Sequence, residues 1–255
     1  MTGSAPASPA LWAGRFTLQM KINNLHSWNL TYREAINIQQ TLREKLILDD
    51  KKMPDKIRTI AGADISYSRG DNIFFAAVVL LEFPSMEVIE ETSFTQRVAF
   101  PYIPGLLTFR EGPPLLKAFE KLRNVPDVAI FDGQGIAHPR GLGLASHMGL
   151  LLDIPTIGCA KTRLTGEYIE VGNKVGDFSC LMLNNKIVGA VLRTKENVKP
   201  IFISQGHKIG LQRSVEIILS SCTGYKLPEP VRKAHLAVSR MRVKMIAVQQ
   251  KTALI

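Results

Sequence analysis

Residues 59–98 of the chain read TIAGADISYSRGDNIFFAAVVLLEFPSMEVIEETSFTQRV. Three segments of this stretch, Thr59–Tyr67, Ile73–Phe83 and Glu87–Val98, are rich in β-branched and aromatic residues, which favour β-strands. The turn-forming residues Gly70-Asp71-Asn72 and Pro84-Ser85 separate the three segments. Strands joined by such short turns pair with their neighbours in sequence, so the stretch predicts a three-stranded antiparallel meander.

The segments that follow the meander alternate between strands and helices. Val128–Phe131 and Thr156–Ala160 are short, mostly apolar runs of the kind that form buried strands. A helix is expected from about Leu115 to Leu122, because Gly112-Pro113-Pro114 before it favours a first helical turn. The other expected elements are a helix over 141–152, strands within 178–204 with a turn at 184–186, and helices over about 211–221 and 230–249.

A further helix is expected before the meander. Thr31 and Glu34 have the spacing of a capping box, and apolar residues continue at helical intervals to about Leu48. Together these elements predict an α/β protein with one mixed sheet, in which an antiparallel meander is followed by parallel strands and helices cover the faces.

Length and composition are those of a globular protein. The 255 residues suffice for one well-packed core, and 45% hydrophobic with 21% charged residues exclude a disordered or fibrous chain. The 32 Lys and Arg residues against 22 Asp and Glu residues leave a net charge of +10, which favours a polyanionic partner. Cys159, Cys180 and Cys222 form no CxxC pair, so neither a disulfide framework nor a structural zinc site is expected.

We expect one domain over residues 30–251, preceded by an extension, residues 1–29, that is disordered or loosely packed. Residues 1–19 lack the basic and apolar regions of a secretory signal, and no apolar run of the chain is long enough to span a bilayer. We therefore expect a cytoplasmic protein that has no membrane partner, and we take it to be a monomer.

Three acidic residues lie next to predicted buried segments, where a carboxylate needs a cation to neutralise its charge. Asp64 interrupts an apolar strand, on the face that also carries Ile60 and Gly62. Asp132 follows a buried strand, at the end where open α/β sheets place their chemistry, and Glu111 precedes the predicted helix. Because hard cations take oxygen ligands, the three acids could bind one or two Mg²⁺ ions for phosphodiester hydrolysis. The alternative is that Asp64 pairs with a basic side chain and that Glu111 serves a helix start.

Two loops are suited to contact a displaced nucleic-acid base. In the first loop, Pro101 and Pro104 restrict the backbone around Tyr102, so this ring could push into a base stack. The alternative is that Phe100 and Tyr102 only pack on the edge of the sheet. The second loop, residues 132–143, contains four glycines, whose backbone can approach a ligand closely.

Four basic or titratable side chains accompany these loops. His138 and Arg140 belong to the glycine-rich loop, and Lys161 stands at the end of a predicted strand, where it could hold a phosphate or remain solvated. His235 lies on the basic last helix, where an isolated histidine is usually a surface or core residue. The residues alone leave both interpretations of each side chain open.

Four motifs resemble those of the endonuclease V family. They are AGADIS at 61–66, PYIPGLLTFREGP at 101–113, DGQGIAHPR at 132–140 and IPTIGCAK at 154–161, and the resemblance extends roughly from Tyr32 to Val248. It implies an RNase H-like fold and Mg²⁺-dependent nicking of DNA at the second phosphodiester bond on the 3′ side of a deaminated base, chiefly hypoxanthine in deoxyinosine. Mn²⁺ is expected to substitute for Mg²⁺.

The resemblance also implies roles for the motif residues. Asp64, Glu111 and Asp132 correspond to metal-binding acids, Lys161 lies near the phosphate, and Tyr102 is a wedge that separates the strands. His138 and His235 are implied as supporting active-site residues. The residues expected to contact DNA are Tyr102, Pro101, Ile103, Gly105, Leu107, Gly133 and Arg140.

This assignment suggests how the base is recognised, and it leaves two other functions open. Hypoxanthine differs from adenine in an O6 acceptor and an N1–H donor, which backbone groups near Gly105, Leu107 and Gly133 could read. A mispaired base is also easier to extrude from a duplex. The two functions that remain open are an inosine-specific endoribonuclease, since contacts to the 2′-OH cannot be read from sequence, and a nucleic-acid-binding relative without catalysis.

Overall fold

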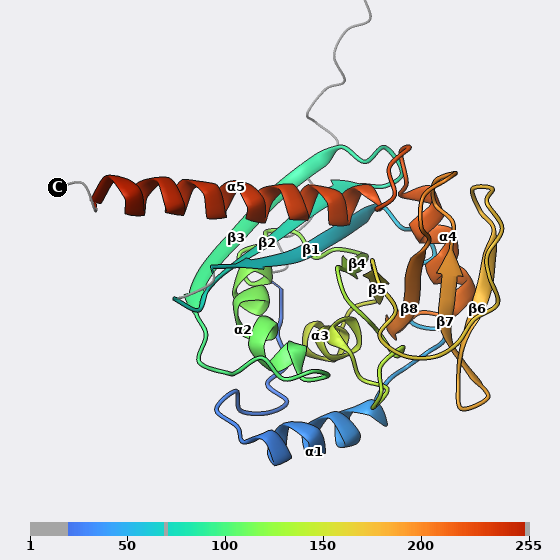
Figure 1. Ribbon diagram of the computed structural model, residues 1–255, viewed down its shortest axis with the longest axis horizontal. Coiled ribbons are helices and arrows are strands. Elements are labelled where there is room, and N and C mark those ends of the chain that lie inside the picture. The colour runs from blue at the N-terminus through green and yellow to red at the C-terminus, as the bar shows by residue number, and fades with distance from the viewer. Residues whose placement is uncertain (1–19, 69–70, 253–255) are drawn as a thin grey trace, which may run out of the picture.

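The structure is a computed structural model that describes residues 20–68 and 71–252 (Figure 1). Eight strands form one sheet in the order β3-β2-β1-β4-β5-β8-β7-β6. The strands are β1 (Thr59–Tyr67), β2 (Ile73–Glu82), β3 (Val88–Arg97), β4 (Val128–Phe131), β5 (Thr156–Ala160), β6 (Phe178–Leu183), β7 (Lys186–Leu192) and β8 (Ile201–His207). The helices are α1 (Tyr32–Arg43), α2 (Leu107–Phe119), α3 (Leu144–Leu152), α4 (Leu211–Ser220) and α5 (Glu229–Thr252).

The pairing of the strands confirms the predicted mixed sheet. β1, β2 and β3 form the antiparallel meander, and β1, β4 and β5 are parallel. β8 and β7 then extend the sheet in antiparallel pairs to the edge strand β6. The parallel strands β1, β4 and β5 lie next to one another at the centre of the sheet, so their C-terminal ends lie side by side.

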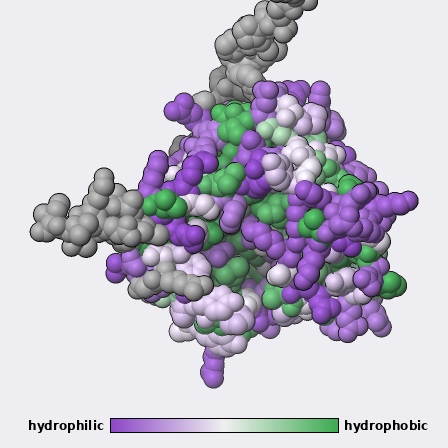
Figure 2. All heavy atoms as spheres, turned by 45° about the horizontal axis from the view of Figure 1, so that its top comes forward, coloured by the Kyte–Doolittle hydropathy of each residue, from purple (hydrophilic) through white to green (hydrophobic). Residues whose placement is uncertain are grey.

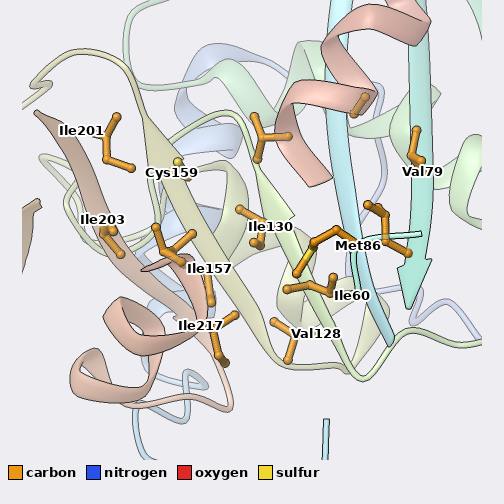
Figure 3. Close-up of a cluster of buried hydrophobic side chains, with 14 of the residues drawn as sticks. Ile60, Val79, Met86, Val128, Ile130, Ile157, Cys159, Ile201, Ile203 and Ile217 are labelled. Carbon is orange, nitrogen blue, oxygen red and sulfur yellow. The ribbon is translucent and has the colours of Figure 1, made fainter. Parts of the chain in front are cut away.

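Alternate residues of the central strands form two hydrophobic cores, one on each face of the sheet. Ile60 and Ile130 belong to the first core, where they pack with residues of α4 and α5 (Figure 3). Ala61 and Ala63 belong to the second core, which α2 and α3 cover. Burial of both faces explains why the strands are apolar throughout and why Asp64 is conspicuous among them.

The close contact between α5 and β1 depends on a glycine. A β-carbon built on Gly62 would lie 1.9 Å from the carbonyl oxygen of Pro230, in the first turn of α5. Figure 1 shows α5 running along the meander and continuing beyond the edge of the sheet. Because Gly62 lets the helix touch the strand, the helix residues that follow Pro230 come close to the C-terminal half of β1.

Three helix predictions were wrong in their bounds. α2 begins at Leu107 rather than Leu115, and it contains Pro113 and Pro114 in its interior. A proline inside a helix removes a backbone hydrogen bond, yet here the burial of Phe109 and the neighbouring apolar residues stabilises the first turns. Glu111 therefore lies in the second turn of α2 and not at its start.

The other two helices are shorter than expected. α1 ends at Arg43 rather than near Leu48, because the backbone of Ile47 forms hydrogen bonds with the Nδ1 atom of His207 and with the N–H of Lys208. α3 begins at Leu144 rather than at residue 141, because Gly141 has a φ of +71°, which is incompatible with a right-handed helix.

The described part of the predicted N-terminal extension lies against the domain. Met20 is buried, and the backbone N–H of Asn23 donates to the carbonyl oxygen of Leu151 in α3. The Trp28 ring lies over Gly112 in α2, where a β-carbon would be 2.7 Å from the ring. Residues 1–19, also assigned to the extension, lie outside the described residues.

The described helices include none that is long and apolar enough to cross a membrane. On the face shown in Figure 2, hydrophilic side chains predominate and hydrophobic ones lie scattered among them. The three cysteines form no disulfide, and Cys159 is part of the first core.

Stability should decrease in acid because of His207. Burial, and next the charge of Lys208, lower the pKa of His207 from 6.5 to about 4, and its Nδ1 atom accepts a hydrogen bond from the N–H of Ile47. Between pH 6.5 and 4 the unfolded histidine binds a proton that the folded one does not, so the free energy of unfolding falls as the pH falls. Between pH 7 and 5, urea denaturation should show a loss about 1–2 kcal/mol larger in the wild type than in His207→Gln. Equal losses would contradict this role.

Candidate active site

The register of β1 and β4 brings two carboxylates together at the edge of the sheet. Ala63 pairs with Phe131 in the parallel ladder, and the backbone N–H of Asp132 donates to the carbonyl oxygen of Ala63 at 3.2 Å. The next residue on each chain segment is an aspartate. Asp64 and Asp132 therefore stand side by side, with Asp64 on the face that Gly62 leaves open to α5.

A histidine and a lysine complete this cluster. The Nδ1 atom of His235, from α5, lies 2.8 Å from the Oδ2 atom of Asp64. The ammonium group of Lys161, at the end of β5, forms an ion pair and hydrogen bond with Asp132. One ligand atom each from Asp64, Asp132 and His235 lie within 4.8 Å of one another, a group that could hold a metal ion.

Negative charge at this edge is poorly compensated. Burial, and next the charge of Asp132, raise the pKa of Asp64, although hydrogen bonds with His235 and the N–H of Ile65 act against the rise. Burial acts to lower the pKa of Lys161, but its bond to Asp132 and the nearby negative charge outweigh this, so that its pKa is raised. The lysine thus stays protonated and pairs with Asp132, while burial and the charge of Asp132 disfavour the ionised form of Asp64.

Glu111 approaches from the opposite side of the sheet. It is partly buried in α2 and does not belong to the group of ligand atoms formed by the two aspartates and His235. Burial, followed by the charges of Asp64 and Asp132, raises the pKa of Glu111 to about 8. The three predicted acids therefore influence one another, but only the two aspartates share the compact cluster.

His138 and Arg140 lie in a separate network around the carbonyl oxygen of Gly105. This oxygen accepts a hydrogen bond from Arg140 Nη2 at 2.6 Å and lies 3.0 Å from His138 Nε2. The His138 Nδ1 atom accepts from the backbone N–H of Arg140, so the remaining proton of a neutral ring sits on Nε2. Burial, and next the charge of Arg140, lower the pKa of His138 to about 4, which keeps the ring neutral.

The sequence interpretation missed Gln39, which also binds the carbonyl oxygen of Gly105. Its buried amide on α1 donates to that oxygen at 2.8 Å and to the carbonyl oxygen of Leu142 at 3.0 Å, and it accepts from Arg140 Nε at 2.5 Å. The available signal was its position on the face of α1 that also carries Ala35 and Leu42, where a polar residue is unexpected.

A small pocket of about 120 Å³ lies beside this network. Gly105 and Leu107, two of the three residues expected near the base, line it, whereas Gly133 packs against the side chain of Leu144. Leu164, which the sequence interpretation did not select, forms part of the lining. The volume corresponds to about four water molecules at about 30 Å³ each, a space that one flat heterocyclic base would fill.

The loop at the mouth of the pocket presents an aromatic ring to solvent. Tyr102 is 69% exposed and lines the pocket, while Phe100 packs against Phe109, with their ring centroids 5.8 Å apart. Ile103 is half-buried in the same cluster as Phe109, and Pro101 is exposed. Of the two aromatic residues in this loop, only Phe100 packs on the domain.

An acidic cluster at the C-terminal ends of the central strands, with a lysine beside it, is suited to an enzyme that hydrolyses phosphate esters with a metal ion. The endonuclease V family model matches residues 40–236. Endonuclease V of Dictyoglomus thermophilum is 53% identical over 207 residues, which cover 81% of this chain and 89% of that protein. The chain therefore belongs to the endonuclease V family and is an enzyme.

Solved structures agree with this assignment. The crystal structure of endonuclease V from Bacillus subtilis matches with a TM-score of 0.85 and 33% identity over 89% of this chain and 99% of that chain. Endonuclease V of Ciona intestinalis, in complex with DNA containing an inosine followed by a ribo-adenosine, matches with a TM-score of 0.74 and 30% identity. That match covers 85% of this chain and 100% of the Ciona chain.

Proposed function

We propose that the protein is a Mg²⁺-dependent DNA repair endonuclease that nicks a strand at the second phosphodiester bond on the 3′ side of a deaminated base, chiefly hypoxanthine. The observation that carries the proposal is the cluster of Asp64, Asp132 and Lys161. The chain continues from this cluster into the base-sized pocket, which is lined by Gln134, two residues after Asp132, and by Leu164, three residues after Lys161. The complex of the Ciona relative with inosine-containing DNA supports the choice of substrate.

The acidic residues fit a hard divalent cation. Asp64 and Asp132 offer carboxylate oxygens within a single cluster, and a cation would offset both the burial and the mutual repulsion of the carboxylates that raise the pKa values of Asp64 and Glu111. We assign the ligands to these two aspartates, with Glu111 as a further acid. A Mg²⁺ ion held there, or Mn²⁺ in its place, would supply a Lewis acid for the phosphate and would lower the pKa of a water molecule.

Other side chains of the chain support this chemistry. Lys161 carries a positive charge next to Asp132, where it can compensate the negative charge of a phosphate oxygen. His235 holds Asp64 in position through its Nδ1 atom, and its ring is half-exposed at the edge that the substrate must approach. We therefore assign Lys161 to phosphate stabilisation and His235 to the orientation of Asp64.

The network around Gly105 prepares the pocket for the extruded base. Gln39, His138 and Arg140 all bind the same carbonyl oxygen, which fixes the loop that follows Tyr102. A fixed backbone can present its polar groups to the O6 acceptor and N1–H donor of hypoxanthine without reorganisation. We assign selection to this pocket together with the lower cost of extruding a mispaired base.

The proposed function is tested by nicking of a duplex with a single deoxyinosine, compared with the same duplex carrying deoxyadenosine. In MgCl₂ we expect one nick, mapped on a sequencing gel to the second bond on the 3′ side, and in EDTA we expect none. MnCl₂ should restore nicking after EDTA treatment. Equal cutting of both duplexes, or nicking that persists in EDTA, would contradict the proposal, and binding without any cutting would indicate a non-catalytic relative.

Inosine-containing RNA is a second candidate substrate. The observation that favours it is the ribo-adenosine next to the inosine in the complex of the Ciona relative. Rates measured side by side on single-inosine DNA and RNA of the same sequence separate the candidates. A higher kcat/KM on RNA would make RNA the main substrate, since the 2′-OH is the group that distinguishes the two.

Loss of the Tyr102 ring should weaken binding to a lesion within a duplex. The ring is exposed and free of the packing that holds Phe100, so it can enter the stack when the base leaves. In Tyr102→Ala we expect an about tenfold higher Kd for an inosine duplex, by fluorescence anisotropy, and a much smaller change for single-stranded inosine DNA. Tyr32→Ala, which removes an exposed ring on α1, should leave both values unchanged. Unchanged duplex affinity in Tyr102→Ala would exclude the wedge.

A further inference from the structure

Lys161 also lines a groove of about 620 Å³, which shares no lining residue with the base-sized pocket. Lys161, Thr162 and Arg163 line this groove, whereas Leu164 lines the pocket, so residues 161–164 separate the two spaces. The groove has the volume of known ligand clefts, about 300–1,000 Å³. It therefore begins directly beside the lysine that contacts Asp132.

Hydrogen bonds hold the two walls of the groove together. The guanidinium group of Arg193 donates to the carbonyl oxygens of Gly172 at 2.9 Å and Val171 at 3.2 Å. The side chain of Asn173 donates to the Oδ1 atom of Asn197 at 2.6 Å. Because these bonds link the segment after β5 to the segment before β8, the groove is formed before any ligand arrives.

The groove carries positive charge that the protein does not neutralise. Arg163 and Lys199 line it, and neither forms an ion pair within residues 20–68 and 71–245. Lys226 lies close by, since its carbonyl oxygen accepts a hydrogen bond from the hydroxyl group of Thr194, the neighbour of Arg193 in the lining. Burial, and further the charges of Lys199 and Lys161, lower the pKa of Lys226. Glu170 is the acidic residue of the lining and also forms no ion pair in those ranges. Like charges held together in this way favour an anionic ligand.

An aromatic ring stands among these cations. Tyr168 is 37% exposed, and its ring packs edge-on against Phe202 with the centroids 5.7 Å apart, so its position is supported from below. The guanidinium carbon of Arg163 lies 5.7 Å from the centre of the Tyr168 ring. A supported aromatic ring with cations around it is the arrangement that binds single-stranded nucleic acid, through base stacking and phosphate contacts.

We infer that this groove binds the nucleotides of the scissile strand that follow the cut on its 3′ side. The inference rests on the proposed function, which places the flipped base in the pocket and the scissile phosphate at Asp132 and Lys161. A strand that leaves the pocket and passes Lys161 arrives at the groove, and the nick lies 3′ of the base. Tyr168 stacks on a base there, and Arg163 and Lys199 bind phosphates.

The test measures how KM depends on the length of DNA after the cut. Duplexes with one deoxyinosine carry a single-stranded tail of one to ten nucleotides after the scissile bond, beyond the end of the complementary strand. For the wild type, KM should rise about tenfold as this tail shortens, while kcat changes little. Arg163→Ala and Tyr168→Ala should show the high KM with every tail, and Tyr168→Phe should behave as the wild type because it keeps the ring.

A matched control and two outcomes complete the design. Arg213→Ala removes the same charge from α4, which contributes no residue to the groove, and should keep the tail dependence of the wild type. Wild-type KM values in both groove variants would overturn the assignment. A KM of the wild type that rises only when the DNA on the 5′ side of the deoxyinosine is shortened would also overturn it. A wild type that nicks no inosine duplex refutes the proposed function instead, and a wild type that nicks all tails with one KM refutes only the groove.

Discussion

Replacing Asp132 or Asp64 by alanine is expected to abolish nicking while the fold persists. Each change removes one of the two carboxylates that the parallel register of β1 and β4 places side by side. Loss of about 4 kcal/mol of transition-state stabilisation lowers a rate about a thousandfold, and we expect at least this loss in kcat at saturating Mg²⁺.

The stability of these variants should not follow their activity. Burial raises the pKa of Asp64, so the ionised carboxylate is disfavoured in the fold and its removal carries little cost in stability. Thermal denaturation of Asp64→Ala should therefore resemble that of the wild type. Ordinary turnover by either alanine variant would refute the assignment of these aspartates.

Asp127 offers a matched control at the opposite end of the same strands. Its carboxylate accepts hydrogen bonds from the backbone N–H groups of Arg58 and Thr59, at 2.7 and 2.9 Å, and lies away from the acidic cluster. Asp127→Ala should lower the free energy of unfolding by about 1–2 kcal/mol and leave kcat unchanged. The comparison separates a carboxylate that holds the sheet from the carboxylates of the active site.

Replacing Gly62 by alanine is expected to have the largest effect on stability. The added β-carbon would lie 1.9 Å from the carbonyl oxygen of Pro230 and 2.7 Å from the backbone nitrogen of Val231. Both contacts are with backbone, so α5 must move away from β1. We expect a loss of about 3 kcal/mol or more in the free energy of unfolding, measured by urea denaturation.

Activity of the same variant reports on the contact between α5 and the acidic cluster. His235 reaches Asp64 only because α5 touches β1, so Gly62→Ala should lower kcat in whatever fraction remains folded. Gly224→Ala is the control, because a β-carbon there meets open space and only the φ of +86° opposes it. It should cost about 1–2 kcal/mol and leave kcat unchanged. Equal stability of the Gly62→Ala variant and the wild type would contradict the close packing of α5.

Local patterns were sufficient for most of the fold. The antiparallel meander and the short buried strands follow from runs of strand-forming residues and the turns between them, and these predictions are confirmed. The helix bounds were less predictable. The start of α2 at Leu107 depends on Phe109 being buried beneath the N-terminal segment, a long-range contact that outweighs the local preference of Pro113 and Pro114 for a first turn.

In the candidate site, too, some residues could be predicted from local sequence and others depended on long-range contacts. The acids, Lys161 and Tyr102 could be selected from motifs, because a carboxylate in an apolar strand and a tyrosine between prolines are unusual locally. Gln39 could not be selected, since its three hydrogen bonds join a helix to two loops more than 60 residues away. The groove beside Lys161 was also not predicted, because its walls come from two separate segments.

The sequence by itself determined where the meander and the short buried strands lie and which side chains are available for chemistry, because side-chain type and local periodicity are properties of neighbouring residues. Only the tertiary structure decided which of these groups meet. The register of β1 on β4 pairs Asp64 with Asp132, and the approach of α5 at Gly62 adds His235 but leaves Glu111 on the other side. Such distances depend on strand register and packing across the sheet, which no local segment encodes.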